Sequence, residues 1–202
     1  MILFATINPE NYKRLWSFQV ANKEQLFAET LNLYAEKGGR FTMDELAARL
    51  CISKKTLYEM VNSKEELAVQ VIDYYFAGVA ALQKAIHEDE SITTIEKLRR
   101  LLCATPDFPM RKYHLHELKM TLPDAYARLD FHMRHGWDGT LSVIEKARAE
   151  GAIRDIDTQL FRTLYAAAIE EVIQGNDVTT DQVFKRKQEE IVDILLNGIC
   201  TR

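Results

Sequence analysis

The sequence contains few of the residues that interrupt or cross-link a chain. Among 202 residues there are only four prolines, eight glycines and three cysteines. Because proline and glycine are the strongest breakers of regular structure, their scarcity favours long helices. The cysteines at positions 51, 103 and 200 are odd in number and widely spaced, which argues against a disulfide framework or a zinc site. We therefore expect reduced thiols in a cytoplasmic protein, and Cys51 to be buried and inert rather than a redox sensor.

The sequence also lacks a long apolar run. Residues 68–82 are rich in apolar side chains, but Gln70 and Asp73 interrupt them, and the stretch is too short to span a bilayer. Residues 1–7 are apolar but have no basic leader, so they do not resemble a secretion signal. With 47% hydrophobic and 28% charged residues, the composition is that of a soluble protein with a real core, and we expect no membrane partner.

A strong excess of positive charge is missing as well. The net charge is −4, which argues against a protein that coats nucleic acid. Residues 1–60 carry eight Lys or Arg against seven Asp or Glu, whereas residues 61–202 carry eighteen against twenty-three. A weakly basic head on an acidic body suits a protein that touches DNA with one end only.

The pattern that is present throughout is the helical period, which predicts an all-α fold. No stretch alternates as a strand does. The expected helices cover 9–20, 22–37, 43–50, 54–60, 64–87, 91–104, 110–120, 123–150, 157–174 and 180–199. We assign residues 1–63 to an N-terminal extension and a DNA-binding head, and residues 64–202 to a ligand-binding and dimerisation body.

Residues 42–67 follow the plan of a helix-turn-helix. Thr42 caps one short helix, with Glu45 completing a capping box, and Ser53 caps a second helix after a short turn. Ala47 supplies the small side chain needed where the two helices cross. In this plan the second helix enters the major groove, and its exposed start contacts bases and phosphates. The predicted DNA-binding residues are Thr42, Ser53, Lys54, Lys55, Thr56, Tyr58 and Lys64.

The same residues resemble a known family. The runs 41–47 (Phe-Thr-Met-Asp-Glu-Leu-Ala), 52–58 (Ile-Ser-Lys-Lys-Thr-Leu-Tyr) and 62–67 (Asn-Ser-Lys-Glu-Glu-Leu) resemble the DNA-binding head of the tetracycline-repressor (TetR) family. The resemblance implies a three-helix head, a helical ligand-binding body and a dimer formed by the last two long helices. It also implies repression that a small molecule relieves.

The chain departs from the family pattern at three places. Cys51 stands in the turn where glycine is common, and we expect it to carry backbone strain of about 1 kcal/mol. Lys55 replaces a second frequent glycine, and Met60 with Val61 replaces an aromatic pair. The helix at 9–20 is an addition, and the role of residues 1–22 stays open.

The body carries no motif of its own, so its sites are predicted from residue types. A cavity between helices should be apolar with a few polar anchors and should hold an unidentified small-molecule effector. The candidate ligand-binding residues are Tyr75, Tyr113, His116, Phe131, His132 and Tyr165. His132 and His135 are three residues apart and could share a metal, but polar packing or ligand lining is the preferred interpretation, and we expect no metal or cofactor.

The last two helices carry more apolar surface than one body can hide. Paired across a two-fold axis, they would form a four-helix interface in a homodimer. The predicted interface residues are Leu160, Leu164, Ala167, Ala168, Val172, Val183, Ile191, Ile194 and Leu195.

These features favour a ligand-responsive transcription repressor that binds a pseudo-palindromic double-stranded operator as a dimer, and not an enzyme. The alternative is a small helical ligand carrier or enzyme with a degenerate head. Against it, the sequence has no phosphate loop, nucleophile elbow or metal quartet. A third interpretation is a DNA-binding protein without an effector, whose body only dimerises.

Overall fold

The computed structural model describes residues 9–105, 115–175 and 180–200, without the side chains of residues 9–22, 115, 116 and 181. All regular elements among these residues are helices, so the predicted all-α class is confirmed. The elements are α1 (Pro9–Lys37), η1 (Gly38–Arg40), α2 (Met43–Arg49), α3 (Lys54–Met60), α4 (Lys64–Glu88), α5 (Thr94–Leu102), α6 (Leu115–Thr121), α7 (Pro123–His135), α8 (Asp138–Ala149), α9 (Thr158–Gln174) and α10 (Asp181–Ile199). No described helix is long and apolar enough to cross a membrane.

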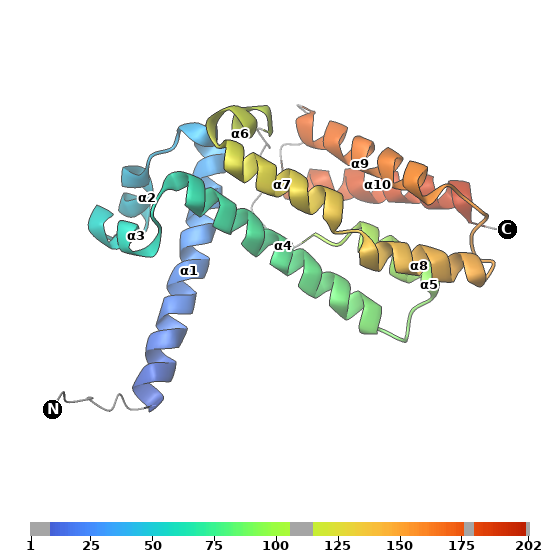
Figure 1. Ribbon diagram of the computed structural model, residues 1–202, viewed down its shortest axis with the longest axis horizontal. Coiled ribbons are helices and arrows are strands. Elements are labelled where there is room, and N and C mark those ends of the chain that lie inside the picture. Colours follow the sequence, from blue (N-terminus) through green and yellow to red (C-terminus); the bar gives the residue numbers. More distant parts are fainter. Residues whose placement is uncertain (1–8, 106–114, 176–179, 201–202) are drawn as a thin grey trace.

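The head gathers at one end of the molecule, where α2 and α3 pack beside α1 (Figure 1). Capping side chains begin α2, α3 and α4 at the expected residues: Thr42, Ser53 and Ser63 each accept a hydrogen bond from the backbone N–H three residues later. The predicted break in the first helix is wrong, since α1 is continuous from Pro9 to Lys37. Residues 20–22 contain no proline or glycine, so nothing local forces the chain out of the helix.

In the body, one predicted helix is instead two separate helices. The single helix predicted for 123–150 is two helices, α7 and α8, which separate at Gly136 and Trp137. The Gly136 N–H still bonds to the His132 carbonyl and ends α7. Trp137 is 9% exposed and packs into the body core, while its Nε1 donates to the Met133 carbonyl at 3.3 Å. The burial of this large ring accompanies the separation of the two helices.

Two apolar cores hold the molecule together. The head core lies between α1, α2 and α3 and includes Leu67 and Val71 from the first turns of α4. The main body core joins α5, α8, α9 and α10. Because α4 completes the head core and then runs along the body (Figure 1), it links the two parts as one rigid element. The division between residues 63 and 64 stays a prediction.

Candidate DNA-binding head and body cavity

The turn between α2 and α3 is a Schellman motif. The Cys51 N–H donates to the Ala48 carbonyl at 3.1 Å, and the Ile52 N–H donates to the Ala47 carbonyl at 3.0 Å. The motif requires a left-handed residue at position 51, and Cys51 has φ +53°, the only positive φ at a described non-glycine residue. This conformation is one that favours glycine, in line with the expected strain at Cys51. The prediction of a buried thiol is wrong, since Cys51 is exposed at the tip of the turn.

Helix α3 is anchored by one face and open on the other. Leu57 is fully buried in the head core, and Ala47 is buried where α2 and α3 meet. The remaining start of the helix faces outward: Ser53, Lys54, Lys55 and Thr56 are exposed, and Tyr58 is 43% exposed. Together with Thr42, which is also exposed, the structure leaves six of the seven predicted DNA-binding side chains open to a partner.

The two lysines of this set lie beside acidic side chains. Lys54 Nζ lies 2.7 Å from Asp44 Oδ1, and this hydrogen bond raises the pKa of Lys54. Lys55 Nζ lies 4.0 Å from Glu59 Oε1 and is 88% exposed. Exposed pairs of this kind contribute little to stability, so phosphate oxygens can replace the carboxylates at small cost.

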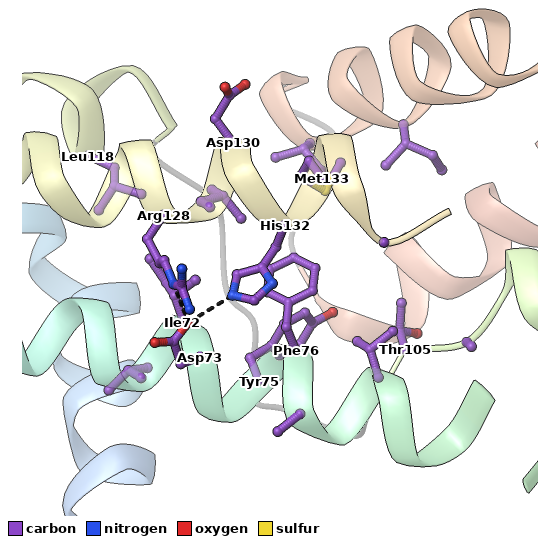
Figure 2. Close-up of a pocket in the computed structure, with 18 of the residues that line it drawn as sticks. Ile72, Asp73, Tyr75, Phe76, Thr105, Leu118, Arg128, Asp130, His132 and Met133 are labelled. Atoms are coloured by element: carbon purple, nitrogen blue, oxygen red, sulfur yellow. Dashed lines mark hydrogen bonds and ion pairs between the residues drawn. The ribbon is translucent and has the colours of Figure 1, made fainter. Parts of the chain in front are cut away.

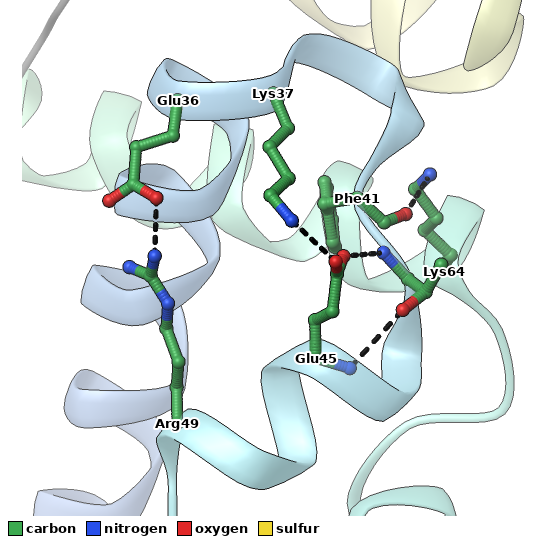
Figure 3. Close-up of polar contacts among 7 residues, drawn as sticks. Glu36, Lys37, Phe41, Glu45, Arg49 and Lys64 are labelled. Carbon is green, nitrogen blue, oxygen red and sulfur yellow. Dashed lines mark hydrogen bonds and ion pairs between the residues drawn. The ribbon is translucent and has the colours of Figure 1, made fainter.

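The Thr42 side chain takes part in the capping box at the start of α2. Its Oγ1 accepts the Glu45 N–H at 3.2 Å, and Glu45 Oε2 accepts the Thr42 N–H at 2.9 Å (Figure 3). Glu45 also receives a hydrogen bond from Lys37, which together with the Thr42 N–H lowers the pKa of Glu45. The exposed Thr42 side chain is positioned beside α3 by this network.

Lys64 has a different placement from the expected phosphate contact. Its Nζ donates to the Phe41 carbonyl at 2.7 Å and to the Gly39 carbonyl, and lies 4.4 Å from the centre of the Phe41 ring (Figure 3). Partial burial lowers the pKa of Lys64. The carbonyls that follow α1 lack helical partners, and a cation satisfies them. Lys64 therefore holds α4 to the head, and its role toward DNA stays a prediction.

A cavity of about 800 Å³ lies in the body, within the size range of pockets that hold drug-sized ligands. Most of its lining is apolar or aromatic and comes from α1, α4, α5, α6, α7, α9 and α10. Three of the predicted ligand-binding residues line it: Tyr75, His132 and Tyr165. Phe131 does not, because it lies on the outer face of α7, 47% exposed and stacked on His135. Tyr113 and the His116 side chain fall outside the described residues.

A cluster of charged and polar side chains, referred to below as the charged group, joins α4 and α7 at this cavity. Asp73 of α4 accepts hydrogen bonds on Oδ1 from Arg128 Nε at 2.5 Å and from His132 Nε2 at 2.7 Å, both from α7 (Figure 2). The Phe76 ring stacks on the His132 ring with centroids 4.4 Å apart. Burial opposes ionisation of Asp73, yet the two hydrogen bonds prevail and lower its pKa, so the carboxylate stays charged near neutrality.

A second, uncharged polar group lies where α5, α9 and α10 meet. The Tyr165 hydroxyl donates to the Leu102 carbonyl at 2.5 Å, and Gln188 Nε2 donates to the same carbonyl at 2.9 Å. Burial raises the pKa of Tyr165 to about 12, so the phenol is neutral. The nearby Thr105 Oγ1 is buried and lacks a hydrogen-bond partner among the described residues. This part of the cavity offers neutral groups only.

The cavity reaches the head. Tyr34 of α1 and Phe41 contribute to its wall, and so do Leu118 and Leu122 at the end of α6. The other face of α6 touches η1, where Gly38 and Gly39 let it approach closely. A β-carbon built on Gly39 would lie 2.0 Å from Thr121 Oγ1. Helix α6 is thus a second contact between cavity and head, besides α4.

The sequence is similar to a known regulator along most of its length. No family model matches the chain. It is 33% identical over 183 residues to the HTH-type transcriptional regulator YvaF of Bacillus subtilis, which covers 87% of this chain and 94% of that protein. Among solved structures, the fold is similar to the TetR-family regulator PfmR of Thermus thermophilus, with a TM-score of 0.61, 17% identity and coverage of 85% and 97%. The chain belongs to the HTH-type transcriptional regulators, and its fold is that of the TetR family.

A further TetR-like fold is that of FadR from Bacillus subtilis, solved with stearoyl-CoA. Its TM-score is 0.63 at 16% identity, with 87% of this chain and 98% of FadR covered. The family resemblance drawn from residues 41–67 is therefore confirmed. The relatives are regulators of transcription rather than enzymes.

Sequence reasoning missed two of the charged residues at the cavity, Asp73 and Arg128. Asp73 was visible only as a polar residue that interrupts an apolar run of α4. Arg128 and His132 are four residues apart and so share one face of α7. An acid inside an apolar helix face, together with a basic pair on another helix, was the available signal.

The predicted dimer residues lie on α9 and α10 with mixed exposure. Leu160, Leu164 and Ile194 are 56%, 51% and 71% exposed, and Ala167 is also exposed. Several others pack within the chain: Val172 and Ile191 join a small cluster with Ile169 and Phe184, and Leu195 packs on the main body core. Ala168 and Val183 are half-buried. The pairing of these helices with a second copy stays a prediction.

Proposed function

We propose that this protein is a cytoplasmic repressor that binds a pseudo-palindromic operator as a homodimer and releases it when a small molecule fills the body cavity. The observation that carries the proposal is the direct connection between two sites. The exposed start of α3 belongs to a helix-turn-helix, and the helix that follows it, α4, forms a wall of an 800 Å³ cavity. A protein that only binds DNA does not need such a cavity.

On DNA, the exposed start of α3 enters the major groove. The Lys55 side chain is held less closely than that of Lys54, since its ammonium is exposed and lies 4.0 Å from the Glu59 carboxylate. A lysine there can donate to the acceptors on a guanine edge. Lys54 and Tyr58 lie where they reach phosphates, and α2 crosses the backbone.

Dimerisation rests on the outer faces of α9 and α10. Leu160 and Leu164 of α9, four residues apart on one face, and Ile194 of α10 are each more than half exposed. Two copies related by a two-fold axis would bury these side chains against one another and set the spacing of the two α3 helices.

The effector acts through the two elements that join cavity and head. A molecule in the cavity presses on Ile72 and Phe76 of α4 and on Leu118 of α6. Movement of either helix shifts the head, because Lys64 ties α4 to Phe41 and Thr121 of α6 abuts Gly39. A hundredfold change in DNA affinity needs only about 2.7 kcal/mol of coupling.

The test is retention of genomic DNA fragments by the purified protein, followed by sequencing. We expect enrichment of fragments with two inverted half-sites, and binding that weakens steeply with salt. Lys55→Ala should change the preferred half-site while leaving the fold intact. A protein that shows no preference among genomic fragments at low salt would overturn the proposal.

A further inference from the structure

The Arg128 guanidinium at the cavity has hydrogen-bond donors that Asp73 does not use. Arg128 carries five N–H donors, of which Asp73 takes only Nε, and the His132 ring takes the same carboxylate oxygen. Two basic side chains therefore converge on one acid. Among hydrogen-bonding groups, a carboxylate is the best complement to such donors because it only accepts.

Other acids of the lining do not take these donors. Asp130 points to the opposite side of α7 from Arg128 and His132 (Figure 2), and both of its oxygens are bonded to Arg134 Nε. Glu170 is exposed on α9 and accepts from Gln174. Neither acid is hydrogen-bonded to Arg128, whose two Nη groups make no hydrogen bond with a described residue.

The position of the group defines the shape of the ligand. Arg128 and Asp73 side chains are each 40% exposed and His132 is 23% exposed, so the charged group lies at the mouth of the cavity. Beyond it the walls are apolar and aromatic, and the polar group around Tyr165 is neutral. A ligand that complements this cavity has a charged end at the mouth and an apolar part inside, so it is an amphiphile.

We infer that the effector is an apolar molecule with a terminal carboxylate, which binds Arg128 and His132 at the mouth of the cavity in competition with Asp73. The inference rests on the proposed function and specifies the chemistry of its ligand. Competition with Asp73 also provides a route to the head, since a ligand that takes Arg128 from Asp73 loosens a contact between α4 and α7.

Three probes with one chain length separate the alternatives by calorimetry: dodecanoate, dodecanol and dodecyltrimethylammonium, each below its micelle concentration. Dodecanoate should bind at least about tenfold more tightly than dodecanol, which corresponds to about 1.4 kcal/mol. Equal binding of dodecanoate and dodecanol, or tighter binding of dodecyltrimethylammonium, would overturn the inference.

Two substitutions in the charged group should change the affinity for dodecanoate in opposite directions. Arg128→Gln should bring the affinity for dodecanoate down to that for dodecanol, while unchanged dodecanol binding shows that the cavity is intact. Asp73→Asn removes the competing acid and should strengthen dodecanoate binding several-fold. Weaker binding of dodecanoate to Asp73→Asn contradicts the inference. Arg154→Gln is the control, because this arginine is exposed and outside the cavity lining, and it should bind as the wild type does.

The same samples separate this inference from the proposed function. A wild-type protein that retains genomic fragments but does not prefer dodecanoate leaves the repressor proposal standing and overturns the ligand class. A protein that prefers dodecanoate but retains no DNA does the reverse.

Discussion

Replacing Cys51 by glycine should stabilise the protein. Cys51 occupies the left-handed position of the Schellman motif with φ +53° and is exposed, so the substitution relieves backbone strain without opening a cavity. A β-carbon in the left-handed region costs about 1–2 kcal/mol, while glycine loses about 0.5–1 kcal/mol more backbone freedom on folding than alanine. The difference leaves a net gain of about 0.5–1 kcal/mol for Cys51→Gly.

The gain is measurable by thermal denaturation. In a chain of this length, about 1 kcal/mol shifts Tm by about 2–4 °C, so Cys51→Gly should raise Tm by about 1–4 °C. Cys51→Ala is the control, since it removes the thiol but keeps the β-carbon, and it should melt with the wild type. If Cys51→Gly is no more stable than Cys51→Ala, the turn is not strained and the reasoning fails.

Three further substitutions test other contacts. Lys64→Met keeps the apolar stem but leaves two carbonyls without their donor, so it should destabilise the protein by about 1–3 kcal/mol in denaturant titrations. Leu164→Glu places charge on the exposed face of α9 and should yield monomers in light scattering that bind DNA poorly. Gly39→Ala drives a β-carbon against Thr121 and should lower Tm and loosen α6 from the head.

Each of these has a matched control and a contrary outcome. Lys55→Met is the control and should leave stability unchanged. If Lys64→Met is as stable as the wild type, the carbonyl contacts are not important and the predicted phosphate contact of Lys64 is favoured. Leu82→Glu changes an exposed leucine of α4 and should leave the assembly as in the wild type, whereas a wild-type monomer at micromolar concentration refutes the dimer. Gly198→Ala meets open space and should not destabilise, so a harmless Gly39→Ala would remove the proposed α6 contact.

The sequence by itself determined the head, because its signals are local. A capping box joins residues three positions apart. The residues that set the helix ends and the turn of a helix-turn-helix lie within about twenty positions of one another. The place of Cys51 in the turn, where glycine is common, indicated backbone strain, and the structure gives this residue a positive φ. Such short-range hydrogen bonds form in the same way in whichever fold surrounds them, so the family resemblance and the all-α class could be inferred before the structure was known.

The tertiary structure alone decided what the side chains outside these local patterns do. Lys64 begins a helix, a typical phosphate position, but it folds back onto carbonyls 23 and 25 residues earlier. Asp73 meets Arg128 and His132 across separations of 55 and 59 residues, and Phe131 turns outward although it neighbours His132. Helical periodicity shows which residues share a face. Which other helix that face meets depends on the packing of the whole chain, where apolar contacts are non-directional and many pairings satisfy the same pattern.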